Sequence, residues 1–527
     1  MAKTVTAQDL RATLLDGDEL ALLDVREEGV FSDSHLLFAS SLPLSRLEFG
    51  IDALVPRRGA RVVLCDDGDG LAERAADRLA DLGYTDVAVL DGGTGAWQRA
   101  GYVLFSGVYV PSKAFGEYVE ETCHTPNITA EELKARLDAG DDLVVLDSRP
   151  MDEFRRMNIP TAIDVPGAEL AYRVHDVAPS PDTTVVVNCA GRTRSIIGAQ
   201  SLIKAGIPNP VMALRNGTMG WELAGFTLER GNERPPPAVS PEGLARARSC
   251  ASRVAARRGI ETIDRDRLAA WRAEADRRSL FLLDVRGVDE YEAGHLAGSR
   301  PIPGGQLVQT TDAVIGTRNA RVVLIDDTGV RATMTAAWLV EMGWPEVALH
   351  RLDPDTDEIE TGAWEPVVLG LDRAETRSVG VEALAAGLAD GTMAAVDLGG
   401  SRTYLAGHIP GAGFALRSRL DGALDKLPRA RTVVLTSPDG RLARLAASER
   451  GGEVACLEGG TEAWAAAGKP LTDGEESMLD RPDDVWLRPY DRGGDVAQAM
   501  NAYLEWELQL VAQLEADGTA RFRRFDG

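Results

Sequence analysis

The sequence is poor in cysteine, in aromatic residues and in positive charge. Its five cysteines are scattered without a CxxC pair, so we expect neither a disulfide framework nor a cysteine-based zinc site. Lys and Arg number 57 against 82 Asp and Glu, and the net charge of −25 disfavours nucleic acids and anionic membranes as partners. No apolar run approaches the ~20 residues of a membrane helix, and the first residues show no secretory signal. These absences predict a cytoplasmic protein with reduced thiols.

What the sequence does contain is internal repetition. An apolar run that ends in Asp occurs four times, at Asp24, Asp147, Asp284 and Asp397. A second β-branched run follows each, and the residue after that run lies 42 positions beyond the Asp in three repeats and 40 in the fourth. These residues are Asp66, Cys189, Asp326 and Ser437, and a Trp closes each repeat, at Trp97, Trp221, Trp364 and Trp464. Such constant spacing over 527 residues predicts four copies of one domain.

Composition places the boundaries between the copies. We predict modules at 1–108, 128–231, 259–370 and 376–475. Residues 109–127 are expected to be a linker, and 232–258 a Pro-rich linker followed by a helix that Ser240 and Pro241 begin. The remaining segment, 476–527, repeats nothing and is predicted to be a helical tail.

Each module alternates strand-like and helix-like stretches. In the second, the run TVVVN precedes a helix whose apolar residues Ile196, Ala199, Leu202 and Ile203 share a face and which ends at Gly206. This alternation predicts an α/β fold of four modules, each a small parallel sheet flanked by helices. In the tail, a packing helix is predicted between Asp495 and Gly518. Its expected apolar stripe is Val496, Met500, Tyr503, Leu504, Leu508 and Val511.

Ligands of parallel sheets bind at the carboxyl ends of the strands, and there only the second module has a thiol. Cys189 opens the loop CAGRTRS, which ends at Ser195. Helix N-terminal amides, together with Arg192 and Arg194, would favour its thiolate, and Gly191 would let the amides converge. The loop therefore predicts a nucleophilic sulfur that accepts an anionic, sulfur-bearing substrate. The alternative is an ordinary strand-to-helix turn with a buried cysteine.

The other cysteines are weaker candidates. Cys65 lies one residue earlier than Cys189 in the repeat, where a strand side chain points to the opposite face. Cys123 and His124 are neighbours in a linker and rarely face each other in that arrangement. Cys250 is expected to be a surface thiol and Cys456 a core thiol. The histidines show no metal spacing, so no metal is predicted.

Several motifs resemble those of the rhodanese family of sulfurtransferases. LLDVRGVDEYEAGHLAGSRPIP (282–303) and VDLGGSRTYLAGHIPGA (396–412) are similar to its first motif, EGGTEAW to its closing motif and CAGRTRS to its active-site loop. The resemblance implies a five-stranded parallel sheet in each module and places the sulfur-accepting cysteine at Cys189. It implies a donor-binding role for Arg149 and a backbone cradle formed by Ala190, Gly191, Arg192, Thr193 and Arg194.

The other modules depart from this family at the decisive position. Asp66 and Asp326 would bind their own amide cradle, and the Ser437 hydroxyl is a poor sulfur nucleophile, so these modules should be inactive. The second module itself has Asn158 where its siblings have His295 and His408, a difference we expect to be structural.

The function that this resemblance implies is transfer of sulfane sulfur from a donor such as thiosulfate to a thiol or cyanide, through a Cys189 persulfide and without a cofactor. One alternative is a sulfur-relay or binding scaffold with negligible turnover. Another is a cysteine-based phosphatase or arsenate reductase, which needs an arginine six positions after the cysteine. Here that position is Ser195 and the arginine is Arg194. The sequence leaves open whether the protein is a homodimer.

Overall fold

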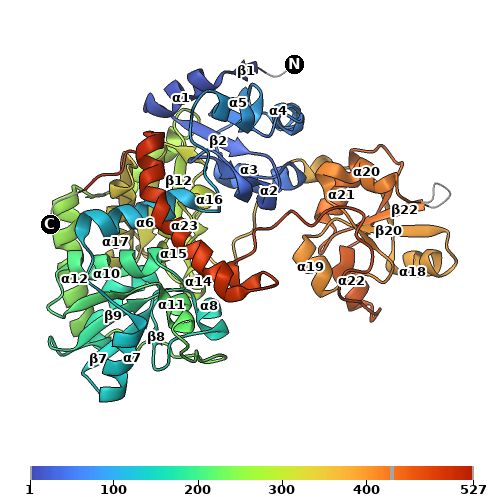
Figure 1. Ribbon diagram of the computed structural model, residues 1–527. Coiled ribbons are helices and arrows are strands. Elements are labelled where there is room, and N and C mark those ends of the chain that lie inside the picture. The colour runs from blue at the N-terminus through green and yellow to red at the C-terminus, as the bar shows by residue number, and fades with distance from the viewer. Residues whose placement is uncertain (1–2, 428–431, 525–527) are drawn as a thin grey trace. The chain divides into compact units, whose positions relative to one another are not determined.

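The computed structural model describes residues 3–427 and 432–524. The segment 428–431, inside the fourth predicted module, and the chain ends 1–2 and 525–527 lie outside the described residues. The chain divides into two compact units. One unit combines 1–10, 21–108 and 366–487, and the other combines 11–20, 109–365 and 488–527. The second and third repeats therefore share a unit with the end of the chain (Figure 1).

The first repeat forms strands β1 (Lys3–Val5), β2 (Leu20–Asp24), β3 (Ser40–Ser41), β4 (Arg61–Cys65) and β5 (Asp86–Leu90). Its helices are α1 (Ala7–Leu15), α2 (Glu28–Asp33), α3 (Leu47–Leu54), α4 (Leu71–Asp81) and α5 (Gly93–Arg99). The fourth repeat has strands β19 (Arg377–Val379), β20 (Met393–Asp397), β21 (Gly413–Phe414), β22 (Thr432–Thr436) and β23 (Ala455–Leu457). Its helices are α18 (Val381–Ala389), α19 (Ser401–Ala406), α20 (Leu420–Leu424), α21 (Arg441–Ser448) and α22 (Gly460–Ala466).

The second repeat has strands β6 (Asn127–Ile128), β7 (Leu143–Asp147), β8 (Ile163–Asp164), β9 (Thr184–Asn188) and β10 (Val211–Leu214). Its helices are α7 (Ala130–Ala139), α8 (Met151–Arg156), α9 (Leu170–Val177), α10 (Thr193–Ala205) and α11 (Gly217–Leu223). Three further helices of this unit lie outside the repeats: α6 (Val110–Cys123) in the predicted linker, α12 (Pro241–Arg258) and α23 (Val496–Asp517) in the tail.

The third repeat has strands β11 (Glu261–Thr262), β12 (Leu280–Asp284), β13 (His295–Leu296), β14 (Arg300–Pro301), β15 (Thr317–Arg318), β16 (Arg321–Asp326), β17 (Glu346–Arg351) and β18 (Ile359–Glu360). Its helices are α13 (Arg265–Ala273), α14 (Val288–Ala293), α15 (Gly304–Gln309), α16 (Thr311–Val314) and α17 (Val330–Glu341). Strands β13 and β18 form a separate antiparallel pair.

Every repeat builds a parallel sheet with the same strand order, exemplified by β6-β10-β9-β7-β8 in the second. The register places Asp147 beside Asn188 and, in the first repeat, Asp24 beside Cys65. Cys65 is therefore equivalent to Asn188 and lies one residue before the position of Cys189, as the sequence predicts. The predicted α/β fold, with four such sheets and a helical tail, is confirmed.

Helices cover both faces of the second sheet, because alternate residues of its central strand face opposite sides. Val185 and Val187 pack with Leu202 of α10. Val186 packs on the other side with Leu133 of α7 and Trp221 of α11. Two apolar layers thus fix the carboxyl end of β9, where the candidate loop begins.

The predicted ends of two helices are confirmed. Helix α10 ends at Gly206, which has a left-handed backbone with φ of 73°. Helix α23 begins after Asp495, whose side chain accepts a hydrogen bond from the Gln498 amide, and ends before Gly518. Among the described residues, no helix combines the length and apolar character needed to cross a membrane.

Two expectations about packing are wrong. Leu508, assigned to the apolar stripe of the tail helix, is 58 % exposed, and Glu507 lies on the buried face instead. Trp364 is 38 % exposed in a loop and is not equivalent to the other closing tryptophans. Those three are buried in α5, α11 and α22, and each indole donates to the carbonyl six residues later. The third repeat lacks the helix that would bury Trp364.

Candidate active site

In each module, backbone amides of the following loop and helix act on the residue that follows the second central strand. In the first module, the amides of Gly68 and Ala72 donate to the Asp66 carboxylate at 2.8 and 2.9 Å. In the fourth, the amide of Ala443 donates to the Ser437 hydroxyl at 3.2 Å. Gly68 lies in the loop two positions after its acceptor. Ala72 and Ala443 lie six positions after theirs, in the first turn of the following helix, where amides have no partner within the helix.

The third module fills the same cradle with a carboxylate. The amides of Thr328 and Ala332 donate to Asp326 at 3.1 and 3.2 Å. Arg331, fully buried, adds an ion pair to Asp326 at 3.3 Å and a second to Glu290. The prediction that Asp66 and Asp326 bind their own cradles is confirmed, and neither leaves the amides available to a substrate.

Only the second module places sulfur in the cradle. Cys189 follows β9, and the backbone amides of Gly191 and Ser195 both act to lower the pKa of its thiol. The Ser195 hydroxyl also lies 2.9 Å from Sγ. These two amides lie two and six positions after Cys189, the offsets at which amides bind Asp66 and Asp326 in the first and third modules. The side chain is nevertheless only 2 % exposed, so the sulfur is closed off from solvent in this structure.

This burial overturns the expectation that the thiolate is favoured in the resting protein. Burial raises the pKa of the Cys189 thiol above its ordinary value, and it outweighs Arg194, Ser195 and the cradle amides, which all act to lower it. The physical reason is that loss of hydration destabilises the thiolate by more than these groups stabilise it. The cradle amides and the Ser195 hydroxyl would instead stabilise the negative charge of the sulfur during the reaction and in the persulfide.

Both arginines of the loop already have carboxylate partners. Arg194 binds Glu153 of α8 through two hydrogen bonds of 2.8 and 2.9 Å. Burial opposes ionisation of Glu153, but the Arg194 guanidinium prevails and lowers the pKa of that carboxyl to about 2. Arg192 binds Glu117 of α6 at 2.6 and 2.8 Å. The charge of Arg194 nevertheless acts on Cys189, where it lowers the pKa of the thiol.

Arg149 is held in the core. Its guanidinium makes two hydrogen bonds to Asp147, at 2.7 and 2.8 Å, and one to the Met157 carbonyl. Arg26 and Arg286 repeat this arrangement in the first and third modules, which have no thiol in the cradle. The recurrence favours a structural role, and the donor-binding role of Arg149 stays a prediction.

Asn158 replaces the histidine of its siblings without changing the contact. Its amide donates to the Phe154 carbonyl, four residues earlier, at 3.0 Å. His295 and His408 bind the equivalent carbonyls, each at 2.8 Å. The difference is therefore structural, as expected.

The closing motif supports the strand-end residue from behind. Gly217 has φ of 54°, and a Cβ there would lie 2.2 Å from the Cys189 carbonyl oxygen. The following amide, of Thr218, donates to that oxygen at 2.9 Å. Gly93 repeats the close approach at 2.3 Å in the first module, toward the Asp66 carbonyl. Glycine is required because a side chain would displace the cradle.

Segments outside the repeats cover the loop. A Cβ placed on Gly191 would lie 3.3 Å from Glu507 Oε2 and 3.5 Å from Tyr503 Cε1, both on α23. Lys113 of α6 is buried beside them, with Nζ 5.2 Å from the centre of the Tyr503 ring. Sequence reasoning missed Glu507 and Lys113, and the only signal was Tyr503 on the predicted stripe.

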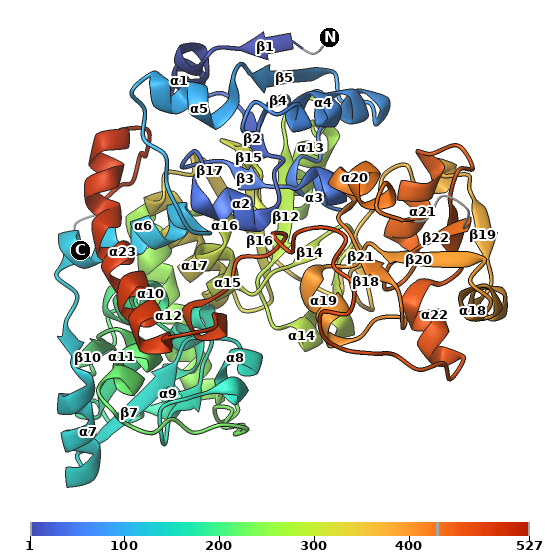
Figure 2. The same ribbon diagram turned by 45° about the vertical axis from the view of Figure 1, so that its right-hand side comes forward.

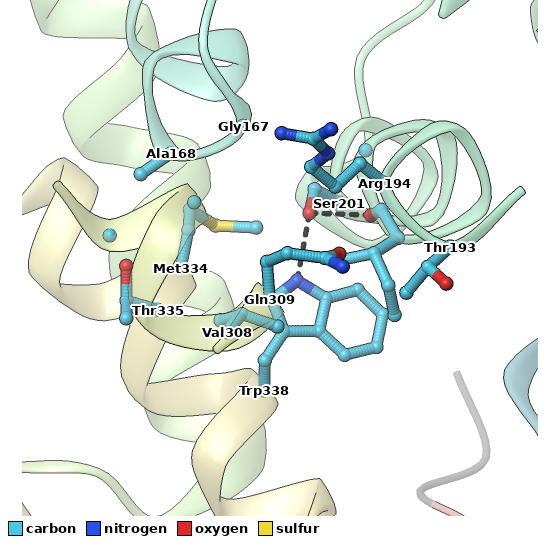
Figure 3. A pocket seen from close by; sticks show the side chains of 14 residues that line it. Gly167, Ala168, Thr193, Arg194, Ser201, Val308, Gln309, Met334, Thr335 and Trp338 are labelled. Atoms are coloured by element: carbon cyan, nitrogen blue, oxygen red, sulfur yellow. Dashed lines mark hydrogen bonds between the residues drawn. The ribbon is translucent and has the colours of Figure 1, made fainter. Parts of the chain in front are cut away.

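A small cavity lies beside the loop, between α10 and helices of the third module (Figure 3). Its volume is about 20 Å³, and its lining includes Thr193, Arg194 and Trp338, whose indole donates to Ser201 at 2.8 Å. A larger hollow of about 530 Å³ is lined by Ser148, among others. Cys189 lines neither of these two hollows.

The other cysteines lie apart from this cradle, and all five are free thiols. Cys65 is the last residue of β4, and burial raises its pKa well above the ordinary value. Cys123 ends α6, next to His124, and Cys456 lies in the core as expected. Cys250 is buried rather than on the surface, because α12 packs against α9 and α17.

Comparison with known proteins gives consistent relatives. A family described as the Rhodanese-like domain matches residues 6–100, 129–224, 265–351 and 380–467. The crystal structure of a thiosulfate sulfurtransferase from Pseudomonas aeruginosa is 50% identical, with a TM-score of 0.96 over 99% of this chain and 100% of that one. A probable 3-mercaptopyruvate sulfurtransferase of the same organism is 31% identical over 32% of this chain and 70% of its own. An HTH-type transcriptional regulator of Mycobacterium tuberculosis is 33% identical over 41% of this chain and 88% of its own.

Replacement of Gly217 by Ala tests the support of the cradle. The clash with the Cys189 carbonyl and the positive φ should cost about 1–3 kcal/mol of unfolding free energy and should change the alkylation rate of Cys189. The matched control is Gly93→Ala, which has the same strain in a module without the thiol. We expect comparable destabilisation in urea unfolding but an unchanged alkylation rate. Equal alkylation by both variants would contradict this role of Gly217.

The raised pKa of Cys189 predicts how its reactivity depends on pH. Burial disfavours the anion, so the thiolate fraction should grow with pH and the alkylation rate should still be rising at about pH 9. Iodoacetamide labelling at a series of pH values, followed by peptide mapping, measures this rate. A plateau reached below about pH 7.5 would show instead a thiol whose pKa is lowered.

Proposed function

The chain belongs to the Rhodanese-like domain family. We propose that it is a sulfurtransferase in which Cys189 takes sulfur from thiosulfate and passes it to a thiol or to cyanide. The observation that supports this most is the content of the four cradles. Carboxylates occupy two and a hydroxyl occupies one, whereas Cys189 alone presents a sulfur to converging amides. Relatives named as thiosulfate and 3-mercaptopyruvate sulfurtransferases agree with this chemistry.

The reaction proceeds by exchange of one sulfur–sulfur bond for another. The sulfur of Cys189 attacks the outer sulfur of thiosulfate, a new S–S bond forms, and the old one breaks with its electron pair leaving on sulfite. The terminal sulfur of the resulting persulfide would bind the amides of Gly191 and Ser195. A thiophilic acceptor then attacks that terminal sulfur and restores the thiol, and no cofactor takes part.

The residues of the loop divide this work. Gly191 and the backbone from Ala190 to Arg194 shape the cradle, and Thr193 begins the helix whose N-terminus faces it. We assign the negative charge of the donor and of sulfite to Arg194, because this cation both acts on Cys189 and lines the neighbouring cavity. Arg192 is assigned a supporting role through its ion pair with Glu117.

The remaining parts of the proposal concern the setting. A cytoplasmic location suits five free thiols, one of which must be reduced to act. The partners are a small anionic donor and a thiophilic acceptor, without nucleic acid or membrane. The first, third and fourth modules are proposed to be inactive, because none has a thiol in its cradle. A homodimer stays a prediction.

One observation favours a second candidate, a sulfur relay with little turnover on small donors. Cys189 is only 2 % exposed, so small donors would load it slowly unless the cover moves. A persulfide that forms once and persists would indicate a relay, whereas repeated release of sulfite and thiocyanate would indicate the enzyme.

Substitution of Cys189 by Ser tests the assignment. Because a hydroxyl lacks the nucleophilicity of sulfur, thiosulfate:cyanide activity should fall to background. The matched control is Cys65→Ser, which removes a buried thiol one strand position away in the repeat, and which should keep wild-type kcat/KM. Formation of thiocyanate measures both variants. Activity retained in Cys189→Ser, or lost in a folded Cys65→Ser, would overturn the assignment.

A further inference from the structure

A buried polar cluster from two helices outside the repeats covers the Cys189 loop. Helix α23 runs alongside α6, and α6 packs in turn on α10 (Figures 1 and 2). The cluster consists of Lys113 from α6 with Tyr503 and Glu507 from α23. Lys113 and Glu507 are almost completely buried. Burial removes the hydration of these groups, so they depend on polar partners within the protein.

The cluster lies against the backbone that cradles the sulfur. Glu507 Oε2 and Tyr503 Cε1 lie at contact distance from the Gly191 position, as the Cβ geometry shows. The charge of Cys189 also acts on the Tyr503 hydroxyl. Burial first, then the Glu507 carboxylate and then Cys189, raise the pKa of Tyr503 well above its ordinary value. The phenol is therefore a neutral hydroxyl, and it donates its proton in a hydrogen bond to Glu507.

One of the two carboxylate oxygens of Glu507 has a hydrogen-bond partner. Its Oε1 accepts a hydrogen bond from the Tyr503 hydroxyl at 2.9 Å. Its Oε2 is buried and has no hydrogen-bond partner among the described residues. Burial raises the pKa of Glu507 to about 7, despite the opposing charge of Lys113. A buried carboxylate with one unused oxygen beside a nucleophile has the chemistry of a proton acceptor.

The proposed reaction requires a proton acceptor for the Cys189 thiol. The resting Cys189 is a thiol, and both arginines of its loop are engaged by carboxylates. Its proton must leave before or during attack on the donor. Ser195 donates to the sulfur rather than providing a base. Among the described buried side chains that leave an oxygen without a hydrogen-bond partner, Glu507 is a carboxylate that lies against the loop backbone at Gly191.

We propose that Tyr503 and Glu507 form a proton relay that takes up the Cys189 proton while sulfur is loaded. The proton passes from Sγ to the phenol oxygen, and the phenol proton passes to Glu507 Oε1. At the same time Sγ bonds to the outer sulfur of thiosulfate, and sulfite departs with the electron pair of the broken bond. The tail helix is thus part of the active site. This inference rests on the proposed sulfurtransferase function.

Unloading makes a different demand. Attack of cyanide on the terminal sulfur releases Cys189 directly as an anion, so that half-reaction requires no proton acceptor. A relay therefore affects loading and spares unloading, whereas a helix that only packs would affect both half-reactions through the position of the loop. Separate measurement of the two half-reactions distinguishes these roles.

Glu507→Gln tests the relay because it keeps the shape and can keep the contact with Tyr503. We expect sulfite release in a single turnover with thiosulfate to slow by roughly 100-fold. Thiocyanate formation from persulfide prepared in advance should stay at the wild-type rate. Tyr503→Phe should show the same pattern. The control is Glu505→Gln on the exposed side of the same helix, with both rates unchanged, and thermal unfolding checks the fold of each variant.

The pH dependence of loading gives a second readout. The charged or titratable groups that face Glu507 are Lys113 and Glu117 on α6, Arg192 in the loop and Tyr503 on α23. In Glu507→Gln the loading deficit should shrink as pH rises and hydroxide ionises the thiol. Equal loading by wild type and both relay variants, or equal slowing of both half-reactions, would overturn the relay. Failure of the wild type to load at all would instead overturn the proposed function.

Discussion

The structure depends on two backbone amides that point at one atom. In three repeats, two amides at fixed offsets act on the side chain that follows the central strand, and in the fourth repeat one amide does so. The strand fixes the acceptor, the helix fixes the donors, and in the second module the glycine of the closing motif holds the turn between them. The four modules share this strand-to-helix turn, and the atom that the sequence places there differs between them.

That atom decides whether the amides are available. The carboxylates of Asp66 and Asp326 accept both donors and leave nothing for a ligand. The sulfur of Cys189 is larger than a carboxylate oxygen and a weaker hydrogen-bond acceptor. A second sulfur bonded to it can therefore take its place at the amides. Burial adds a second requirement, because exclusion of water raises the pKa of the thiol that must react. Burial stabilises the resting state, and the amides and Arg194 stabilise the charged states that follow.

Most of the scaffold could be predicted from local patterns. The repeat spacing located Cys189, and the caps of α10 and α23 located their helices. What failed depends on contacts between segments distant in the sequence. Cys250 looked like a surface thiol because the helices that bury it come from other modules, and Glu507 interrupts an apolar stripe with no local sign of its burial. The expected thiolate was wrong because the loop sequence carries no sign of how deeply its sulfur is buried.

The central claim is that a single sulfur atom, Cys189 Sγ, accepts the transferred sulfur. The most direct measurement is to incubate the wild-type protein with thiosulfate that is isotopically labelled in its outer sulfur, then to map the label by peptide mass spectrometry without reduction. The account predicts label on the peptide that contains Cys189 alone. Label on any other cysteine with an unlabelled Cys189 would contradict it.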